Sequence, residues 1–280
     1  MDLDTYRRRN HETWGRMAAG WEHELLWMWN VTRPVGEALV AMLEPERGQT
    51  ILELAAGSGE TGFAAAAQLG EGGKLITCDL GFDAIQAARL RAAQLGLDNI
   101  EFRVMDSQRM DLDDDSVDGV LCRWGYLRVE DPATALAQTR RVLREGGRLS
   151  FSVWADPDRN PWAAIPGRAL AKHGDTPAPR PGAPGEFAMA DGKRIEAVLG
   201  AAGFGSPLIQ EMEIEWRFRD LDAYWSALVQ LDGALGQVMA GLDERDRAQV
   251  CRTIEHKADR YRQDDGGYAF PGVALNAVAS

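Results

Sequence analysis

The stretch ILELAAGSGETG, residues 51–62, decides the fold. Its apolar first half is the end of a buried strand over 50–56, and an alanine-rich helix is expected over 60–69. The glycine pattern G-x-G-x-x-G between them is formed by Gly57, Gly59 and Gly62. A glycine loop with a strand before it and a helix after it lets a ligand approach the backbone. The loop therefore predicts a binding site without naming the ligand.

The same alternation of strand and helix continues on both sides of this loop. Further β-rich runs predict strands at 74–80, 100–106, 117–125, 148–154, 208–218 and 268–278. Amphipathic helices separate them; one is marked by apolar residues at spacings of three and four, namely Ile85, Ala88, Ala92 and Leu95. Strands separated by single helices predict an α/β fold, a doubly wound, mostly parallel sheet with helices on both faces.

The flanks of this core differ from it. Residues 1–48 read as a helical N-terminal cap, and 49–155 as the ligand-binding core. Residues 156–280 would complete the sheet. Within them a Pro/Gly-rich loop at 176–185 is expected to be mobile, and a helical insertion is expected at 220–262 before the last strand.

Composition excludes several classes of function. The 280 residues carry a net charge of −12, so binding to nucleic acid or to an anionic membrane surface is disfavoured. No apolar run reaches the roughly 18 to 20 residues of a membrane helix, and no apolar stretch follows the N-terminal arginines as in a secretory signal. Three scattered cysteines form neither a disulfide framework nor a metal site. These features favour a cytoplasmic protein without a structural metal.

Two ligands compete for the glycine loop. Asp79 follows Gly57 by 22 residues, which suits a nicotinamide dinucleotide. Glu53, however, lies in the strand before the loop, where an anion suits a cationic ligand such as a sulfonium better than a pyrophosphate. Asp106 ends the third strand, where it could accept from an adenine amino group. No tyrosine has a lysine four residues on, as short-chain dehydrogenases require. These features favour a ligand with a cationic part, such as an ammonium or a sulfonium group, over a nicotinamide dinucleotide.

At these residues the chain resembles the class I S-adenosylmethionine-dependent methyltransferases, in particular the methyltransferase-11 group that includes quinone-ring C-methyltransferases. The first motif of that family, E/D-x-G-x-G-x-G, is matched over residues 53–59, with Ala55 in place of the first glycine. The resemblance implies a Rossmann-like, seven-stranded sheet whose last strand is antiparallel. It also implies S-adenosylmethionine as cofactor and S-adenosylhomocysteine as product.

The resemblance implies a set of cofactor-binding residues. From the loop these are Glu53, Ala55, Gly57, Ser58 and Gly59; from the second and third strand ends, Asp79 and Leu80 at the ribose and Asp106 and Ser107 at the adenine. In this family an N-terminal helix folds over the cofactor, and Trp14 and Trp21 have the matching seven-residue spacing. The structural alternatives are that Glu53 accepts a hydrogen bond from a nearby backbone amide, that Asp79 and Asp106 cap helices, and that the tryptophans only pack the helix.

Three further residues are candidates for the chemistry. Arg123 lies in an apolar strand and would pair with a carboxylate, either of the cofactor or of the substrate, unless it forms an internal ion pair. His23 and His173 are weak candidates for a general base, because a lone histidine on a helix usually has no such role.

The expected function is methyl transfer to a small-molecule acceptor by in-line displacement, with no dedicated covalent residue. The alternatives are an NAD(P)-dependent oxidoreductase and a non-catalytic S-adenosylmethionine-binding protein. The expected partner is the small-molecule acceptor, and a homodimer is one option for the assembly.

Overall fold

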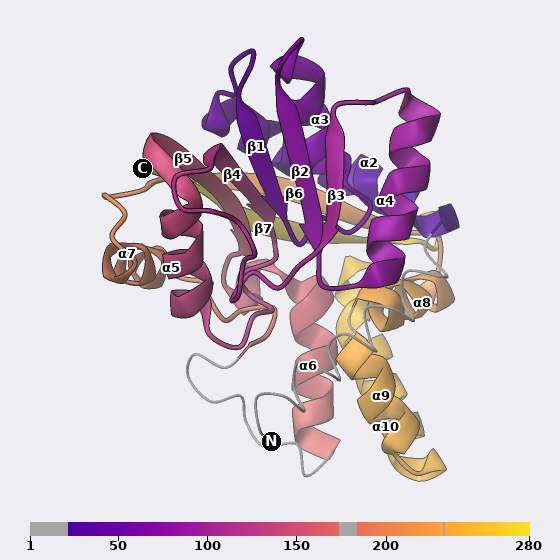
Figure 1. The fold of residues 1–280 in the computed structure, drawn as a ribbon. Coiled ribbons are helices and arrows are strands. Elements are labelled where there is room, and N and C mark those ends of the chain that lie inside the picture. Colours follow the sequence, from indigo (N-terminus) through magenta and orange to yellow (C-terminus); the bar gives the residue numbers. More distant parts are fainter. Residues whose placement is uncertain (1–21, 174–183, 232) are drawn as a thin grey trace.

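A computed structural model describes residues 22–173, 184–231 and 233–280, and these form a mixed seven-stranded sheet (Figure 1). The strand order is β3-β2-β1-β4-β5-β7-β6. The strands are β1 (Thr50–Leu54), β2 (Lys74–Asp79), β3 (Ile100–Val104), β4 (Val117–Arg123), β5 (Leu143–Trp154), β6 (Leu208–Phe218) and β7 (Tyr268–Ala279). Strands β1 to β5 pair in parallel, whereas β7 runs antiparallel to both β5 and β6. The predicted fold class is confirmed.

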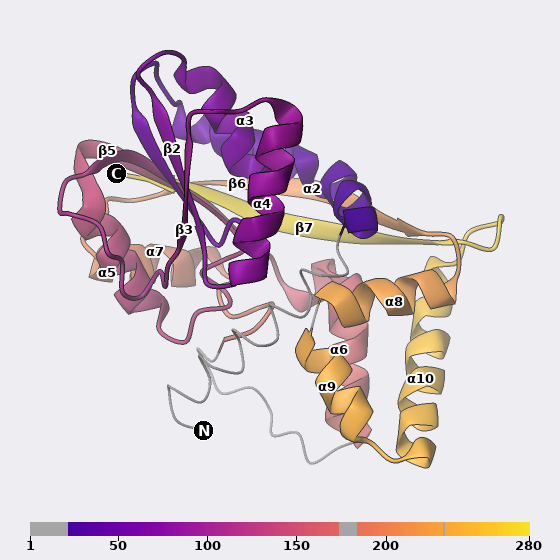
Figure 2. The ribbon, with the colours of Figure 1, turned by 45° about the vertical axis from the view of Figure 1, so that its right-hand side comes forward.

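Helices cover both faces of this sheet (Figures 1 and 2). The helices are α2 (Glu22–Leu43), α3 (Glu60–Leu69), α4 (Phe82–Leu95), α5 (Pro132–Val142), α6 (Pro161–His173), α7 (Gly192–Ala201), α8 (Leu221–Leu231), α9 (Gly233–Gly241) and α10 (Glu244–Ala258). Helices α2, α3 and α4 pack on one face, and α5 and α7 on the other. Helices α6, α8, α9 and α10 lie beyond the carboxyl ends of the parallel strands, where they cover the end of the sheet that binds ligands in such folds.

The two-residue period of β1 assigns its side chains to the two faces. Ile51 belongs to the apolar cluster beneath α3, and Leu52 and Leu54 belong to the cluster that includes α5 and α7. Glu53 therefore points toward α3 rather than along the strand into the loop. This orientation decides what its carboxyl group can contact.

The predicted elements occur with small shifts at their ends. Asp131 caps α5, since its side chain accepts hydrogen bonds from the amides of Ala133 and Thr134 at 3.0 and 3.1 Å. Gly146 and Gly147 follow this helix in the chain. The helix ends at Val142, and both glycines lie within β5, where the register against β4 shifts. The expected boundaries between cap, core and C-terminal part remain predictions.

The insertion expected before the last strand is present as α8, α9 and α10. Among the described residues no helix combines the length and apolar character needed to cross a membrane. Cys78 and Cys122 are buried and Cys251 is half-buried, and all three thiols are free.

Candidate functional site

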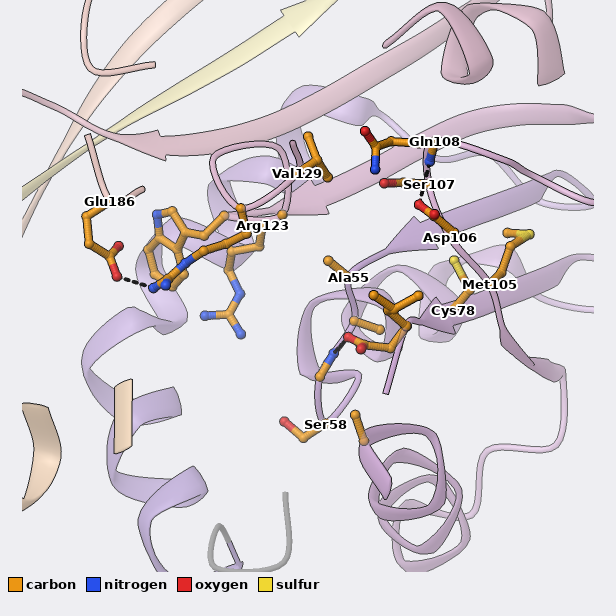
Figure 3. A pocket seen from close by; sticks show the side chains of 18 of the residues that line it. Ala55, Ser58, Cys78, Met105, Asp106, Ser107, Gln108, Arg123, Val129 and Glu186 are labelled. Atoms are coloured by element: carbon orange, nitrogen blue, oxygen red, sulfur yellow. Dashed lines mark hydrogen bonds and ion pairs between the residues drawn. The ribbon is translucent and has the colours of Figure 1, made fainter. Parts of the chain in front are cut away.

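A cavity of about 230 Å³ opens at the carboxyl ends of the parallel strands (Figure 3). It lies where the chain leaves β1 for α3 on one side and β4 for α5 on the other, the point at which the strand order reverses. Its walls come from 55–58, 78–80, 105–108, 123–125 and 128–130, together with Met28, Ala84, Trp154, Trp162, Glu186 and Trp216.

The glycine loop turns back on itself through three left-handed residues. Ala55, Gly57 and Gly59 have φ angles of 51°, 57° and 85°. Glycine reaches this region without a Cβ clash, whereas alanine is strained there. The strained residue is the one that replaces the first glycine of the motif. The loop presents backbone to the cavity and ends at Gly59, the N-cap of α3.

Asp79, the last residue of β2, ties the loop to its neighbours. Its Oδ2 accepts a hydrogen bond from the Gly57 amide at 2.9 Å, and its Oδ1 accepts one from the Gly81 amide at 2.9 Å. Asp79 and Leu80 both line the cavity. The Asp79 carboxylate therefore holds the glycine loop and the turn after β2 in place, and the residue also lines the cavity.

Asp106 occupies the corresponding place after β3. Its Oδ1 accepts from the Gln108 amide at 2.8 Å, which closes a tight turn. Figure 3 shows Asp106, Ser107 and Gln108 together on one side of the cavity, with Arg123 and Glu186 on the opposite side. Two acids that end neighbouring strands thus face one space.

Glu53 is 3% exposed and is not among the residues that line the cavity. Its Oε1 accepts from the Gly62 amide at 2.7 Å, and its Oε2 accepts from the Thr77 hydroxyl at 3.1 Å. Burial raises its pKa to about 8, because desolvation outweighs these two hydrogen bonds and the nearby charge of Arg123. The carboxyl group therefore supports the first turn of α3, and its contact with a cofactor stays a prediction.

Arg123, at the end of β4, points toward the same face as Glu53 and lines the cavity. It donates from Nε to the Thr61 hydroxyl at 2.9 Å and from Nη1 to the Thr32 hydroxyl at 3.0 Å. No carboxylate in the described part of the chain lies within 4.0 Å of it, although the charges of Glu53 and Glu60 act on it from farther away. Burial lowers its pKa to about 10.

Comparison with known proteins identifies the family. Residues 45–165 match the family model of a methyltransferase domain. They contain the glycine loop and the strands β2 and β3, at whose carboxyl ends Asp79 and Asp106 lie. These residues form a class I S-adenosylmethionine-dependent methyltransferase domain. The match removes the oxidoreductase interpretation of the glycine loop.

Curated relatives share this methyltransferase domain. Nocamycin O-methyltransferase of Saccharothrix syringae is 30% identical over 176 residues, which are 62% of this chain and 60% of that protein. Demethylmenaquinone methyltransferase of Clavibacter sepedonicus is 33% identical over 135 residues, 48% of this chain and 50% of that protein. The matches thus span half to about three fifths of these relatives. The resemblance to quinone C-methyltransferases is confirmed at the level of the family.

Solved structures agree on the fold. The YcgJ protein from Bacillus subtilis superposes with a TM-score of 0.60 over 87% of this chain and 96% of that chain, at 17% sequence identity. At this identity the likeness concerns architecture alone.

The sequence analysis missed the aromatic side of the methyltransferase cavity. Trp124, Trp154, Trp162 and Trp216 line it, and we call these four side chains the tryptophan compartment. Trp124 and Trp154 stack with ring centroids 4.3 Å apart. Two of these residues could have been predicted from the sequence, because Trp124 and Trp154 each lie at the carboxyl end of a predicted strand. The other two come from α6 and β6, which no local pattern connects to the loop.

Four predicted site residues are not placed by the structure. Trp14 and Trp21 lie outside the described residues. His23 lies in α2 and His173 ends α6, but the positions of their side chains are not described. Their assigned roles stay predictions.

Proposed function

We propose that this chain transfers a methyl group from S-adenosylmethionine to a small-molecule acceptor by in-line displacement. One observation carries the proposal: a single cavity joins the glycine loop and its two strand-end acids to an apolar wall of tryptophans. When bound, the cofactor would supply an electrophilic methyl group on its sulfonium. To use it, the protein must bind the adenosine part through polar contacts and exclude water around the methyl group. The cavity has both kinds of surface.

The residues of the loop and of the strand ends fit the adenosine part. The left-handed turn at 55–59 brings backbone close to the cavity, and Asp79 and Leu80, which line it, would contact the ribose. Asp106 and Ser107, which also line the cavity, would contact the adenine. Each hydrogen bond to a carboxylate contributes about 1.5–3 kcal/mol, so these two acids would account for much of the affinity.

Arg123 would hold an anionic group at the other end of the cavity. Its guanidinium is held by the two threonine hydroxyls of Thr32 and Thr61, and lies over the rings of Trp29 and Trp124 at 5.5 and 4.8 Å. An arginine largely removed from water, with no carboxylate within ion-pair distance among the residues that the structure describes, favours an anionic ligand. The carboxylate of the cofactor's methionine part is one such group, and a carboxylate of the acceptor is the other.

Methyl transfer requires no covalent intermediate with a residue of the protein. Holding the attacking atom in line with the methyl carbon supplies roughly 7 to 11 kcal/mol through proximity and orientation. The tryptophan compartment would exclude water from this step, which strengthens the electrostatic contacts within the cavity. Two curated relatives, a nocamycin O-methyltransferase and a demethylmenaquinone methyltransferase, support a small-molecule acceptor.

Calorimetry tests the cofactor assignment directly. We expect S-adenosylhomocysteine to bind the full chain and NAD to bind at least about a hundredfold more weakly, a difference of about 2.8 kcal/mol. Equal affinity for the two would contradict the proposal. Transfer of a labelled methyl group to a panel of small molecules then separates an enzyme from a non-catalytic binding protein, which would bind the cofactor without turnover.

A further inference from the structure

Glu53 and Arg123 lie beneath the same turn of α3. Glu53 of β1 is in register with Leu121 of β4, so Arg123 lies two residues farther along the neighbouring strand, on the same face of the sheet. Arg123 Nε donates to the Thr61 hydroxyl at 2.9 Å. Glu53 Oε1 accepts from the amide of the next residue, Gly62, at 2.7 Å. A charge on Glu53 would therefore act directly on the Arg123 guanidinium.

The hydrogen bonds that hold the Arg123 guanidinium come from neutral groups. Its Nη1 donates to the Thr32 hydroxyl, which donates in turn to the Met28 carbonyl at 2.9 Å and so keeps its oxygen as the acceptor. Within the described residues, Thr32 and Thr61 accept from two of the five guanidinium N–H groups. Arg123 also lines the cavity, so its charge and its other donors can serve an anionic ligand.

Two other acids near this turn have partners of their own. Glu60, whose charge also acts on Arg123, forms an ion pair with Arg91 of α4 at 2.9 Å. Asp79, whose charge acts on Glu53, accepts hydrogen bonds from two backbone amides at 2.9 Å. The Glu53 carboxyl group accepts one backbone amide and one hydroxyl, and it has no ion pair within the described residues.

Glu53 changes its charge close to neutral pH. Because burial raises its pKa to about 8, it is mostly protonated below that pH and mostly ionised above it. Burial also raises the pKa of the Cys122 thiol to about 12 and that of the Cys78 thiol above its usual value, which keeps both thiols neutral around pH 8. The Thr77 hydroxyl fits both forms of Glu53, since a hydroxyl can donate to the carboxylate or accept from the acid.

The position of Arg123 favours the methionine part of the cofactor as its anionic partner. Figure 3 shows Ala55, of the glycine loop, between Arg123 and Asp106. A cofactor with its adenosine at the two strand-end acids would extend its methionine part along this loop, toward the first turn of α3. Arg123 is bound at that turn, through Thr61. The amino end of a helix also favours a negative charge.

We propose that Arg123 binds the carboxylate of the cofactor's methionine part and that Glu53 is a positioning residue whose charge sets the strength of this contact. While Glu53 is protonated, the guanidinium keeps its full attraction for the ligand carboxylate. Once Glu53 is ionised, it repels that carboxylate and competes with it for the same guanidinium. The proposal rests on the proposed function, because it assigns one end of the same cofactor site.

Calorimetry with S-adenosylhomocysteine on the full chain, at about pH 6.5 and about pH 9, tests this coupling. The natural chain is compared with Glu53→Gln, which keeps an acceptor for the Gly62 amide but carries no charge at either pH. We expect the two proteins to bind within about twofold of each other at the lower pH, and Glu53→Gln to bind about fivefold more tightly at the higher pH. Comparing two proteins at one pH cancels the titration of the ligand's own amino group.

A second ligand and a second variant identify the groups that are coupled. Decarboxylated S-adenosylhomocysteine keeps the amine but lacks the carboxylate, so Glu53→Gln should bind it no more tightly than the natural chain does at the higher pH. In an Arg123→Gln background, Glu53→Gln should change the affinity for S-adenosylhomocysteine by less than about twofold at either pH. Arg148→Gln, which removes a half-exposed ion pair with Glu44 outside the cavity lining, should keep the fivefold gain. The comparison of ligands carries the test alone if Arg123→Gln does not fold.

The outcomes distinguish the two proposals. A natural chain that does not bind S-adenosylhomocysteine overturns the proposed function. Binding that is equal in the natural chain and Glu53→Gln at both pH values overturns the coupling and leaves the proposed function standing.

Three further results would also overturn the coupling. A tenfold loss of affinity in Glu53→Gln at the lower pH would make Glu53 a direct ligand of the cofactor. A gain that persists with the decarboxylated ligand, or in the Arg123→Gln background, would show that Glu53 acts on another group. Unaltered affinity of Arg123→Gln for S-adenosylhomocysteine would assign Arg123 to a different anion, such as a carboxylate of the acceptor.

Discussion

The carboxyl group of Glu53 and the backbone of Gly62 are in direct contact. Glu53 Oε1 accepts a hydrogen bond from the Gly62 amide at 2.7 Å, and a Cβ at position 62 would lie 2.2 Å from Glu53 Oε2. The third glycine of the G-x-G-x-x-G pattern is therefore required by a side chain of the preceding strand, at a point that does not line the cavity.

Gly62→Ala should accordingly destabilise the protein, although alanine is the better helix former. Forcing a methyl group against a buried carboxyl group costs about 1–3 kcal/mol. Gly167→Ala in α6 is the matched control, because nothing lies within 4 Å of its added Cβ. It should raise the free energy of unfolding by about 0.5–1 kcal/mol. Urea unfolding measures both, and two shifts of the same sign would contradict the explanation.

Glu53→Gln should change how stability depends on pH. Folding raises the pKa of Glu53 from 4.5 to about 8, so the folded state prefers the protonated form. That contribution to stability is complete below pH 4.5 and is lost as the pH rises through 8. Relative to Glu53→Gln, the natural chain should thus become steadily less stable across this range.

The control for this prediction is Glu101, whose contribution to stability changes with pH in the opposite direction. Hydrogen bonds from Lys74 and Arg103 lower the pKa of Glu101, so its contribution to stability appears as the pH rises above the lowered value. Thermal midpoints of the natural chain, Glu53→Gln and Glu101→Gln at several pH values check both slopes. A Glu53→Gln profile parallel to that of the natural chain would show that Glu53 titrates normally.

Asp79→Ala should weaken both cofactor binding and the fold. The variant loses the acceptor of the Gly57 and Gly81 amides, which lowers the free energy of unfolding by about 1–3 kcal/mol. Affinity for S-adenosylhomocysteine should fall at least about tenfold in calorimetry. Asp83→Ala, on the exposed first turn of α4, should change neither by more than a few tenths of a kcal/mol. Unaltered affinity in Asp79→Ala would remove Asp79 from the site.

Ala55→Gly should stabilise the chain. Ala55 is held at φ 51°, where a Cβ is strained, so glycine relieves strain that exceeds its own entropic cost. We expect an increase in the free energy of unfolding of up to about 1 kcal/mol. Ala64→Gly, in α3, should instead lower it by about 0.5–1 kcal/mol. If both variants lose stability alike in urea, Ala55 is not strained.

The elements of the sheet could be predicted because each leaves a local pattern. The strand that ends at the glycine loop, the helix with apolar residues at spacings of three and four, and the strand at 208–218 are each marked by residues within a few positions of one another. Asp79 and Asp106 were found in the same way, since both directly follow short apolar runs. The contact of Gly62 with the Glu53 carboxyl group was not predicted, because the glycine pattern does not indicate which side chain packs against each glycine.

The sequence alone therefore determined the α/β class, the site at the loop over 53–59 and the acids that end two strands, since periodicity and turn chemistry act over short separations. Only the tertiary structure decided that Glu53 turns toward α3, that Ala55 and Trp124 adopt left-handed backbone, and that four tryptophans from β4, β5, α6 and β6 share one cavity. These features depend on packing between segments far apart in the chain. No short stretch of sequence carries that information.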